Sequence, residues 1–484
     1  MKSLHYTFVL LGLLVVGMIN AQPLPVLDTS VKAFVEKKDY GLIEVQGLQT
    51  GDYIPYWMRS LQHGSVPVAG TSLSVIGAYV RDYRGAADKV RLGMGLQVRG
   101  NLGTSVNGAL LEAYVKAKTK RMEFKAGRFR QVLGLTDSTL GIGGFTYSGN
   151  SLPIPMIQAR LPENSFPLWD SLISFHGTFA QGWMGDTRAN YSGNKKTLKQ
   201  YMHQKSLYIR IGKPTAKVSG TIGIVHQAFW VNHTKLMGDS IFKINPYQSY
   251  MYLLTGKQYA YKQGYQLTTN LGNHVGQLDL GIDIVGKSTI TRLYRQFLFD
   301  TDYSYKKKTL KDGLNGISIV NRKPATGSFY FRKLTVEYFS SMNETSNIEY
   351  YNHEMLYEGV SYLGASIGNP FLPLKKEIRS SLPTASQILI VTGVGFPNTR
   401  VRVLHTGMEW AIDKVIFRNR FSFSRNFGML ETKGKFPPTN QFSMSVEAGI
   451  PLRKGWQART LFALDSGGLY YNSAGGFISM MRIF

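Results

Sequence analysis

Cysteine is absent from this chain of 484 residues. Its absence excludes disulfide bonds, thiolate metal sites, a cysteine nucleophile and the lipidated cysteine that anchors a lipoprotein. Acidic residues are also scarce: the 30 Asp and Glu face 56 Lys and Arg, which gives a formal net charge of +26. Such an excess favours an anionic partner, although a basic chain without any specific ligand is the alternative.

Long apolar runs are equally rare, and the one near the N-terminus, Phe8–Ile19, follows the basic residue Lys2. It is shorter than the roughly 20 residues of a transmembrane helix. It ends close to Ala21, a small residue suited to a signal-peptidase site. We therefore predict a signal peptide over residues 1–21 and a mature chain from about Gln22. No later run approaches transmembrane-helix length, which excludes a helical membrane protein.

Alternation of apolar and polar residues recurs along the rest of the chain, as in strands with one apolar face. From Lys89 to Gly100, Leu92 and Leu96 lie on one face, and Arg91 and Arg99 lie on the other. Similar runs are Ala109–Lys118, Ser171–Gln181, Lys205–Gly212, Lys217–Val225, Gln277–Val285, Ser328–Tyr338, Val401–Ile412, Val415–Arg425, Gln441–Ile450 and Trp456–Leu464. A soluble sandwich could alternate in this way, but so many runs without a dividing linker favour an all-β fold, one large antiparallel transmembrane β-barrel.

Four stretches are too long and irregular for hairpin turns: Thr136–Phe166, Asn232–Met251, Arg292–Ile317 and Met342–Thr384. We expect them to form extracellular loops or plugs of the lumen, and to carry the function. Residues 22–61 fit strands poorly, so we assign them to the periplasm, with a short helix over Thr29–Lys38, and assign the barrel to 62–484. The aromatic Phe484 ends an alternating run and is interpreted as a signal for the barrel-assembly machinery.

Several motifs occur in an order that is similar to one known family. They are Ile54–Ser60, Lys125–Phe129, Gly149–Ile157, His203–Tyr208, Gly223–Trp230, Tyr350–Glu354, Glu358–Gly364, Ile367–Pro370 and Phe417–Gly428. Together they resemble the capsule-assembly Wzi family in its Bacteroidetes-type sequences, except that Val360 and Ser361 stand where the family usually has Trp. The resemblance implies about eighteen antiparallel strands, a small periplasmic helical element, a lumen blocked by inward loops, and binding of capsular or exopolysaccharide at the cell outer membrane.

Two of the irregular regions combine tyrosine rings with cations, which suit sugar rings and uronate or phosphate charges respectively. The candidate polysaccharide-binding residues are Tyr247, Tyr250, Tyr259 and Lys262 in the first region, and Arg292, Tyr294, Arg295, Tyr303 and Tyr305 in the second. We expect attachment of an acidic polysaccharide through many weak contacts. Outer-membrane lipid or lipopolysaccharide is a further expected partner, whereas nucleic acid is not.

Other functions are less favoured by the sequence. A porin or a channel for anions or oligosaccharides is the main alternative, because a basic lumen would pass anions if it were open. An outer-membrane hydrolase is less favoured, because no Ser, His and acidic residue stand in a suggestive arrangement. We expect no cofactor and no metal, since His203, His226 and His233 lack the spacing of familiar zinc motifs.

Overall fold

The computed structural model describes residues 39–484, apart from 68–69, 86–88, 105, 192–193, 239–242, 264, 301–308, 324–326, 345–349, 354–355, 384–394, 431 and 433–434. The wall strands are β1 (Asp39–Thr50), β2 (Ser72–Arg84), β3 (Arg91–Gly103), β4 (Asn107–Lys118), β5 (Glu123–Arg128), β6 (Pro155–Leu168), β7 (Ile173–Tyr191), β8 (Asn194–Ile211), β9 (Val218–Trp230), β12 (Asn273–Val285), β13 (Thr289–Asp300), β14 (Gly313–Asn321), β15 (Phe329–Ser340), β18 (Val401–Ile412), β19 (Val415–Asn426), β20 (Thr439–Pro451), β21 (Trp456–Gly467) and β22 (Ser473–Ile483). Shorter elements are α2 (Tyr56–Arg59), α3 (His233–Met237), α4 (Pro246–Thr255), the pairs β10 (Tyr259–Gln263) with β11 (Tyr265–Thr269) and β16 (Ser361–Tyr362) with β17 (Ala365–Ser366), and the 3₁₀ turns η3 (Thr309–Lys311), η4 (Lys375–Glu377) and η5 (Arg453–Gly455).

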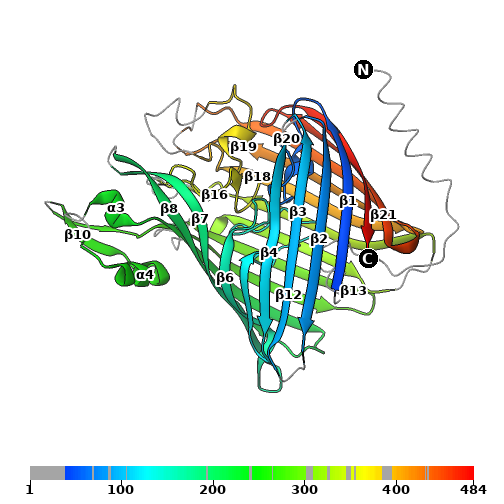
Figure 1. Ribbon diagram of the computed structural model, residues 1–484, viewed down its shortest axis with the longest axis horizontal. Helices are drawn as coiled ribbons and strands as arrows, with labels where there is room; N and C mark the ends of the chain where they lie inside the picture. The colour runs from blue at the N-terminus through cyan, green and yellow to red at the C-terminus, as the bar shows by residue number, and fades with distance from the viewer. Residues whose placement is uncertain are drawn as a thin grey trace.

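The wall is a closed antiparallel barrel of 18 strands, each paired with its neighbours along the chain (Figure 1). Closure is made by β1, which pairs with β2 on one side and with the last strand, β22, on the other. The predicted barrel of about eighteen strands is therefore confirmed. Among the residues that the structure describes, no helix is both long enough and apolar enough to cross a membrane.

Side chains on the wall alternate between an apolar outer face and a polar inner face. On β3, Leu92, Met94 and Leu96 are exposed on the outside, whereas Arg99 and Asn101 are buried on the inside. A ring of exposed apolar side chains around a polar interior is the pattern of a barrel whose outer face meets lipid. The alternation predicted from the sequence is thus the alternation between these two faces.

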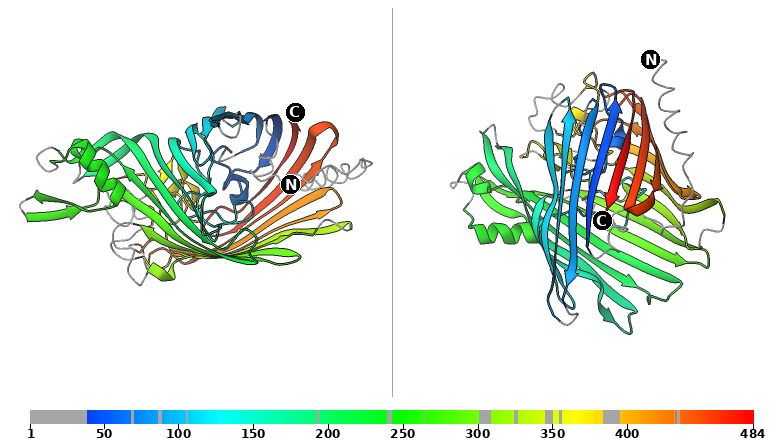
Figure 2. Two further views of the ribbon diagram at one scale, coloured as in Figure 1. Left: turned by 90° about the horizontal axis from the view of Figure 1, so that it is seen from below. Right: turned by 45° about the vertical axis from the view of Figure 1, so that its right-hand side comes forward.

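The connections differ between the two ends of the barrel. At one end, which we call the short-turn end, strands are joined by turns such as 286–288 and 413–414. At the other, the long-loop end, the largest connections are 129–154, 231–272 and 341–400. The connection 231–272 carries α3, α4 and the β10–β11 pair, which project sideways beyond the ring of strands (Figures 1 and 2).

Three predicted boundaries differ from the structure. The expected loop Thr136–Phe166 ends within the wall, because β6 begins at Pro155. The stretch Arg292–Ile317 is mostly wall, because β13 and β14 pair with each other and leave only 301–312 as a loop. β1 lies within residues 22–61, so the barrel begins earlier than the predicted boundary at residue 62. Its inner face mixes the apolar Leu42 and Leu48 with Glu44 and Gln46, so the two faces of this strand differ little in polarity. The predicted helix over 29–38 lies outside the described residues.

Candidate functional site

The connection 129–154 turns into the barrel, where Asp137 fastens it to the wall. One carboxylate oxygen of Asp137 accepts hydrogen bonds from the backbone amides of Thr139 and Leu140, at 2.9 and 3.0 Å. The other oxygen accepts a bond of 2.8 Å from Ser318 on β14 and lies 2.5 Å from the ammonium of Lys333 on β15. Burial alone would raise the pKa of Asp137, but the Lys333 charge and the hydrogen bonds outweigh it and hold that pKa below its ordinary value.

Further anchors join the same connection to other wall strands. The amide of Ile142 donates to Glu337 on β15 at 2.7 Å, and the amide of Thr146 donates to Gln277 on β12 at 3.2 Å. Gln131 donates to Gln204 on β8 at 3.1 Å, His405 Nε2 on β18 lies 2.6 Å from the carbonyl oxygen of Leu140, and Arg420 on β19 donates to the carbonyl of Thr139. The connection therefore crosses the lumen rather than extending outward.

The connection 341–400 packs onto this first loop inside the barrel. The Tyr351 hydroxyl donates to the carbonyl of Phe145 and accepts a bond of 2.8 Å from the amide of Asn369. The Asn369 side chain in turn donates to the carbonyl of Gly143 at 3.0 Å. The rings of Phe145 and Tyr351 are stacked with centroids 4.8 Å apart. Both loops thus share one buried interface.

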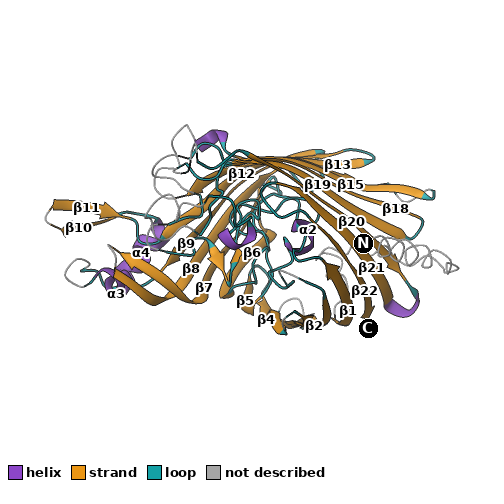
Figure 3. Cartoon of the chain, turned by 90° about the horizontal axis from the view of Figure 1, so that it is seen from above, coloured by secondary structure: helices purple, strands orange, loops and turns teal. Residues whose placement is uncertain are grey.

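The short helix α2 completes this interior core. Its Tyr56 and Trp57 are fully buried, and the Tyr56 ring lies 4.8 Å from Phe371 of the connection 341–400 and 5.5 Å from Tyr470. The amide of Tyr56 donates to Asp465 on β21 at 2.7 Å. Figure 3 shows these loops gathered inside the ring of strands. Two of the four stretches expected to form extracellular loops or plugs therefore contribute to a plug, and we use this name for 129–154, α2 and the described residues of 341–400 together.

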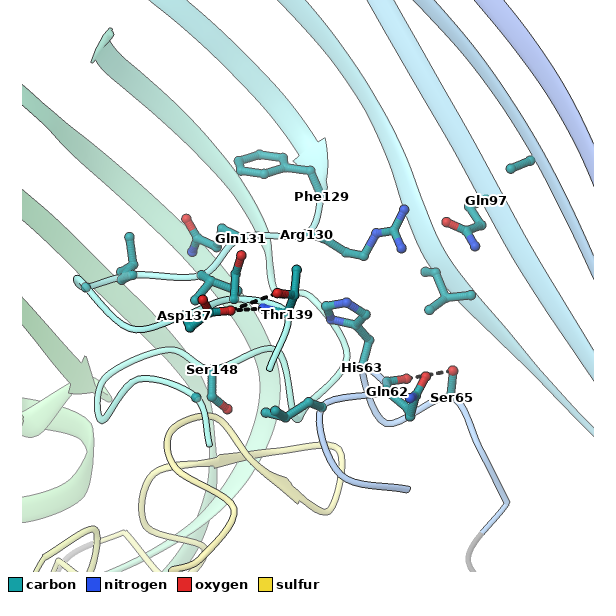
Figure 4. Close-up of a pocket in the computed structure, with 18 of the residues that line it drawn as sticks. Gln62, His63, Ser65, Gln97, Phe129, Arg130, Gln131, Asp137, Thr139 and Ser148 are labelled. Carbon is teal, nitrogen blue, oxygen red and sulfur yellow. Dashed lines mark hydrogen bonds between the residues drawn. The ribbon is translucent and has the colours of Figure 1, made fainter. Parts of the chain in front are cut away.

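A cavity of about 700 Å³ lies against the plug, lined by Gln62, His63, Arg130 and Asp137 among others (Figure 4). Its basic lining residues are Arg99, Lys125, Arg130, Arg160, Arg418, Arg420 and Arg459, and its acidic ones are Glu44, Asp137 and Glu447. Several of these charges are paired: Arg130 lies 2.8 Å from Glu112, and Arg459 lies 3.1 Å from Glu447. Burial, reinforced by the charge of Arg130, lowers the pKa of His63 to about 3. The cavity lining is net basic, and four of its seven basic side chains form ion pairs.

A partly exposed group of aromatic and cationic side chains lies at the long-loop end. The rings of Tyr53 and Tyr471 are stacked, with centroids 3.9 Å apart and planes 9° apart, and Tyr53 is 44% exposed. The guanidinium of Arg379 lies 5.4 Å from the Tyr471 ring centroid and donates to the carbonyls of Tyr470 and Gly467, at 2.8 and 2.7 Å. We call Tyr53, Tyr471 and Arg379 the tyrosine–arginine platform.

Sequence reasoning missed this platform because its three residues come from three different connections. Tyr53 follows β1, Tyr471 lies between β21 and β22, and Arg379 belongs to 341–400. No spacing along the chain relates them. The Tyr470–Tyr471 pair in a short turn between two strands was the one local signal available.

The first predicted region lies on the connection 231–272, which projects sideways from the barrel and which we call the side extension. Tyr247 on α4 is 73% exposed, so its ring is free to contact a ligand. The Tyr250 hydroxyl lies 3.4 Å from Nδ1 of His203 on β8, and Tyr259 packs edge-on against Tyr252 with centroids 5.5 Å apart. Tyr250 and Tyr259 therefore hold the extension together, and the side chain of Lys262 lies outside the described part of the structure.

The second predicted region is not a loop. Arg292 forms an ion pair with Asp283 at 2.6 Å, and Tyr294 is buried and donates to Glu337. Arg295 donates to Asn315 at 2.5 Å on the neighbouring strand. All three predicted residues lie on β13, so their expected place in an extracellular loop is wrong. Arg292 and Tyr294 point into the barrel, and Arg295 points outward. Both faces of β13 therefore carry a charged residue, which made the strand hard to predict from its sequence. Tyr303 and Tyr305 lie outside the described residues.

Two histidines contact each other on neighbouring wall strands. Nε2 of His226 lies 2.9 Å from Nδ1 of His274 on the adjacent strand. Within the described ranges, no group of three or more histidine and carboxylate side chains is arranged to hold a metal ion. His226 and His274 therefore form a hydrogen-bonded pair.

Comparisons with known proteins identify the fold. No protein-family model matches the chain, and no curated protein matches it in sequence. Among solved structures, it is similar to Wzi of Escherichia coli, which is described as an outer membrane protein involved in group 1 capsule assembly and as a carbohydrate-binding β-barrel. The two chains are 11% identical, the match covers 91% of this chain and 83% of Wzi, and the TM-score is 0.55. OccAB4 of Acinetobacter baumannii is covered over 99% of its chain and 93% of this one, with 8% identity and a TM-score of 0.47. At these identities the likeness shows the fold alone: the chain is an outer-membrane-type β-barrel.

Proposed function

We propose that this protein binds acidic capsular or exopolysaccharide at the surface of the cell outer membrane and thereby attaches or organises it, without catalysing a reaction. Membership of the Wzi family is part of this proposal. The observation that carries it is the plug, in which two long connections and α2 fill the lumen with buried aromatic contacts and wall-anchored hydrogen bonds.

The orientation of the barrel follows from its loops. Outer-membrane barrels have short periplasmic turns and longer extracellular loops. We therefore place the long-loop end outside the cell and the two ends of the described chain, Asp39 and Phe484, on the periplasmic side. This orientation presents the tyrosine–arginine platform and Tyr247 to surface polymers.

The chemistry of the platform suits an acidic glycan. A stacked tyrosine pair offers an aromatic face to the apolar side of a sugar ring, and Arg379 adds a positive charge beside it. One such contact is weak, but a polymer repeats its sugars, so several contacts along one chain add avidity. The carbohydrate binding described for the similar barrel Wzi supports the same class of ligand.

A channel for anions or oligosaccharides is the rival function, and the net basic cavity is the observation that favours it. An open channel needs a continuous water path, whereas here the connection 129–154 is bonded across the lumen to β12, β14 and β15. We therefore favour binding over transport.

The test is retention of surface polysaccharide in a strain that lacks this protein, with cell-bound and released glycan measured beside total synthesis. We expect glycan to move into the medium at unchanged total, and wild-type protein to reverse the loss. A Tyr53→Ala, Tyr471→Ala double variant should restore retention only partly. The matched control is Trp169→Ala, which removes a 73% exposed aromatic residue at the short-turn end and should restore retention fully. Unchanged retention in the deletion strain would refute the proposal.

A further inference from the structure

Two arginines face each other on the outside of the barrel. Arg402 on β18 is directly opposite Arg425 on β19, and both side chains are exposed. Like charges at directly opposite positions of a sheet destabilise it. The same strand pair shows the contrasting arrangement on its inner face, where Arg418 is opposite Glu409 at 2.6 Å.

Both guanidinium groups are held over one aromatic ring. Their central carbons lie 5.9 Å (Arg402) and 5.5 Å (Arg425) from the ring centroid of Phe427. Cation–π contacts of this kind orient the two groups but leave their charges uncompensated. Within the part of the chain that the structure describes, neither arginine forms an ion pair.

The position of the pair coincides with the edge of the apolar outer surface. The next outward residues toward the short-turn end are Leu404 and Phe423, which are 55% and 50% exposed and also directly opposite each other. Beyond the arginines, β19 ends at Asn426 and the connection 427–438 begins. In a bilayer the arginines would therefore lie at the level of the lipid head groups, just outside the hydrocarbon layer.

We propose that Arg402, Arg425 and Phe427 form a site for the phosphate group of an outer-leaflet lipid. Two planar guanidinium forks can each donate a pair of hydrogen bonds to one phosphate, and the dianion would neutralise the repulsion between them. The acyl chains of the same lipid would lie along Leu404 and Phe423. The site differs from the tyrosine–arginine platform and depends only on the orientation given above for the long-loop end.

The experiment uses purified, folded protein in detergent and native mass spectrometry to count bound molecules of lipopolysaccharide, its phosphatase-treated form, or inorganic phosphate. We expect wild type to retain the phosphorylated lipid at least tenfold better than the Arg402→Gln, Arg425→Gln variant, since each lost charge-assisted contact is worth about a factor of ten. The dephosphorylated lipid should bind both proteins equally weakly. The control is Arg482→Gln, another outward arginine over an aromatic ring, Trp456, at the short-turn end.

The outcomes separate the possible ligands. Equal retention of the two lipid forms by the wild type would overturn the site, and so would undiminished binding in the glutamine variant. If inorganic phosphate bound as tightly as the lipid, the proposal that the ligand is a lipid would be overturned. If the glutamine variant does not fold, Arg402→Lys, Arg425→Lys keeps the charge but not the planar fork and should bind several-fold more weakly. Surface polysaccharide should be retained normally by either variant, so a failure here is distinct from a failure of the proposed polysaccharide binding.

Discussion

Asp137 illustrates how a few buried residues determine the state of the lumen. Its carboxylate has four partners, two within its own connection and two on the wall, and it is buried beside Lys333. A buried ion pair costs desolvation when it forms, but removing one partner leaves the other charge uncompensated. The same reasoning applies to Glu337, which accepts hydrogen bonds from both Ile142 of the plug and Tyr294 of the wall.

The Asp137→Ala variant should weaken attachment of the connection 129–154 to the wall by about 3 to 5 kcal/mol, because Lys333 loses its partner. Single-channel recordings in planar bilayers should then show frequent open events, against few for wild type. Asp137→Asn, which keeps the shape and part of the hydrogen bonding, should give an intermediate frequency. Conductance that is the same in all three proteins would mean that this contact does not hold the lumen closed.

Lowering the pH to 5 should not release Asp137 from the wall as the Asp137→Ala substitution does. A carboxylate with a lowered pKa contributes stability above its unfolded pKa of about 3.9, and this contribution is lost as pH falls through the lower folded value. Asp137 therefore stays charged at pH 5, and loss of its contacts with Lys333 and Ser318 should not open the lumen in wild-type recordings between pH 7 and pH 5. Opening at pH 5 would point to a different titrating group.

The side extension 231–272 is an element whose parts are specified locally. The side chain of Asn245 accepts from the amide of Gln248 at 2.8 Å, Pro246 occupies the first turn of α4, and Gly256 ends the helix in a left-handed conformation with φ of 68°. Asn232 caps α3 in the same way, accepting from Lys235 at 2.9 Å. These are standard start and stop signals for helices. These residues predict both helices, so the expectation of an irregular loop over 232–251 is wrong there.

The pH response of this element depends on His233 in α3, which is only 5% exposed. Burial lowers its pKa to about 4, with a smaller contribution from the charge of His274, so the folded extension favours the neutral ring. The unfolded ring binds a proton below about pH 6.5, so stability is complete above that pH and falls as pH drops toward 4. At pH 5 the loss should be about 2 kcal/mol.

Limited proteolysis would measure this loss. Cleavage within 231–272 should be faster at pH 5 than at pH 7 in the wild type, and the barrel wall should resist cleavage at both. His233→Gln removes the titrating group and should show the same cleavage rate at both pH values. A pH effect that persists in this variant would assign the response to another histidine.

Closure of the whole barrel depends on the two ends of the described chain. β22 pairs with β1 from Ile483 to Gly475, and Phe484 exchanges backbone hydrogen bonds of 3.0 and 3.1 Å with Gly41. The ring of Phe484 packs over Gly41, where a side chain would collide with it. Phe484 thus belongs to the seam that closes the barrel, and its expected role as a signal for the barrel-assembly machinery stays a prediction.

The Phe484→Ala variant separates these two roles. In cells it should give several-fold less folded barrel, detected as the heat-modifiable band in electrophoresis. Refolding of purified protein from urea into detergent should be nearly unchanged, because the exposed ring buries little surface. A parallel loss in both assays would instead assign Phe484 a purely structural role.

The sequence predicted the wall where one face of a strand is apolar throughout. Val401–Ile412 was predicted with the bounds that β18 has, and Val415–Arg425 ends one residue before β19 does. β1, β6, β13 and β14 lie outside the predicted runs; on β1 the inner face carries apolar residues such as Leu42 and Leu48, and on β13 the outer face carries Arg295, so the two faces differ little in polarity. Strand periodicity is a local property, so it can be read from neighbouring residues wherever the two faces differ in polarity.

The barrel class, the basic character of the chain and most of its strands were thus determined by the sequence alone. Only the tertiary structure decided that 129–154 and 341–400 turn inward, that Tyr53, Tyr471 and Arg379 meet, and that Arg402 faces Arg425. Each of these contacts joins residues from separate connections or strands, and no local pattern encodes such a meeting. They form because barrel closure fixes the strand register, which brings distant side chains together on one face or in one lumen.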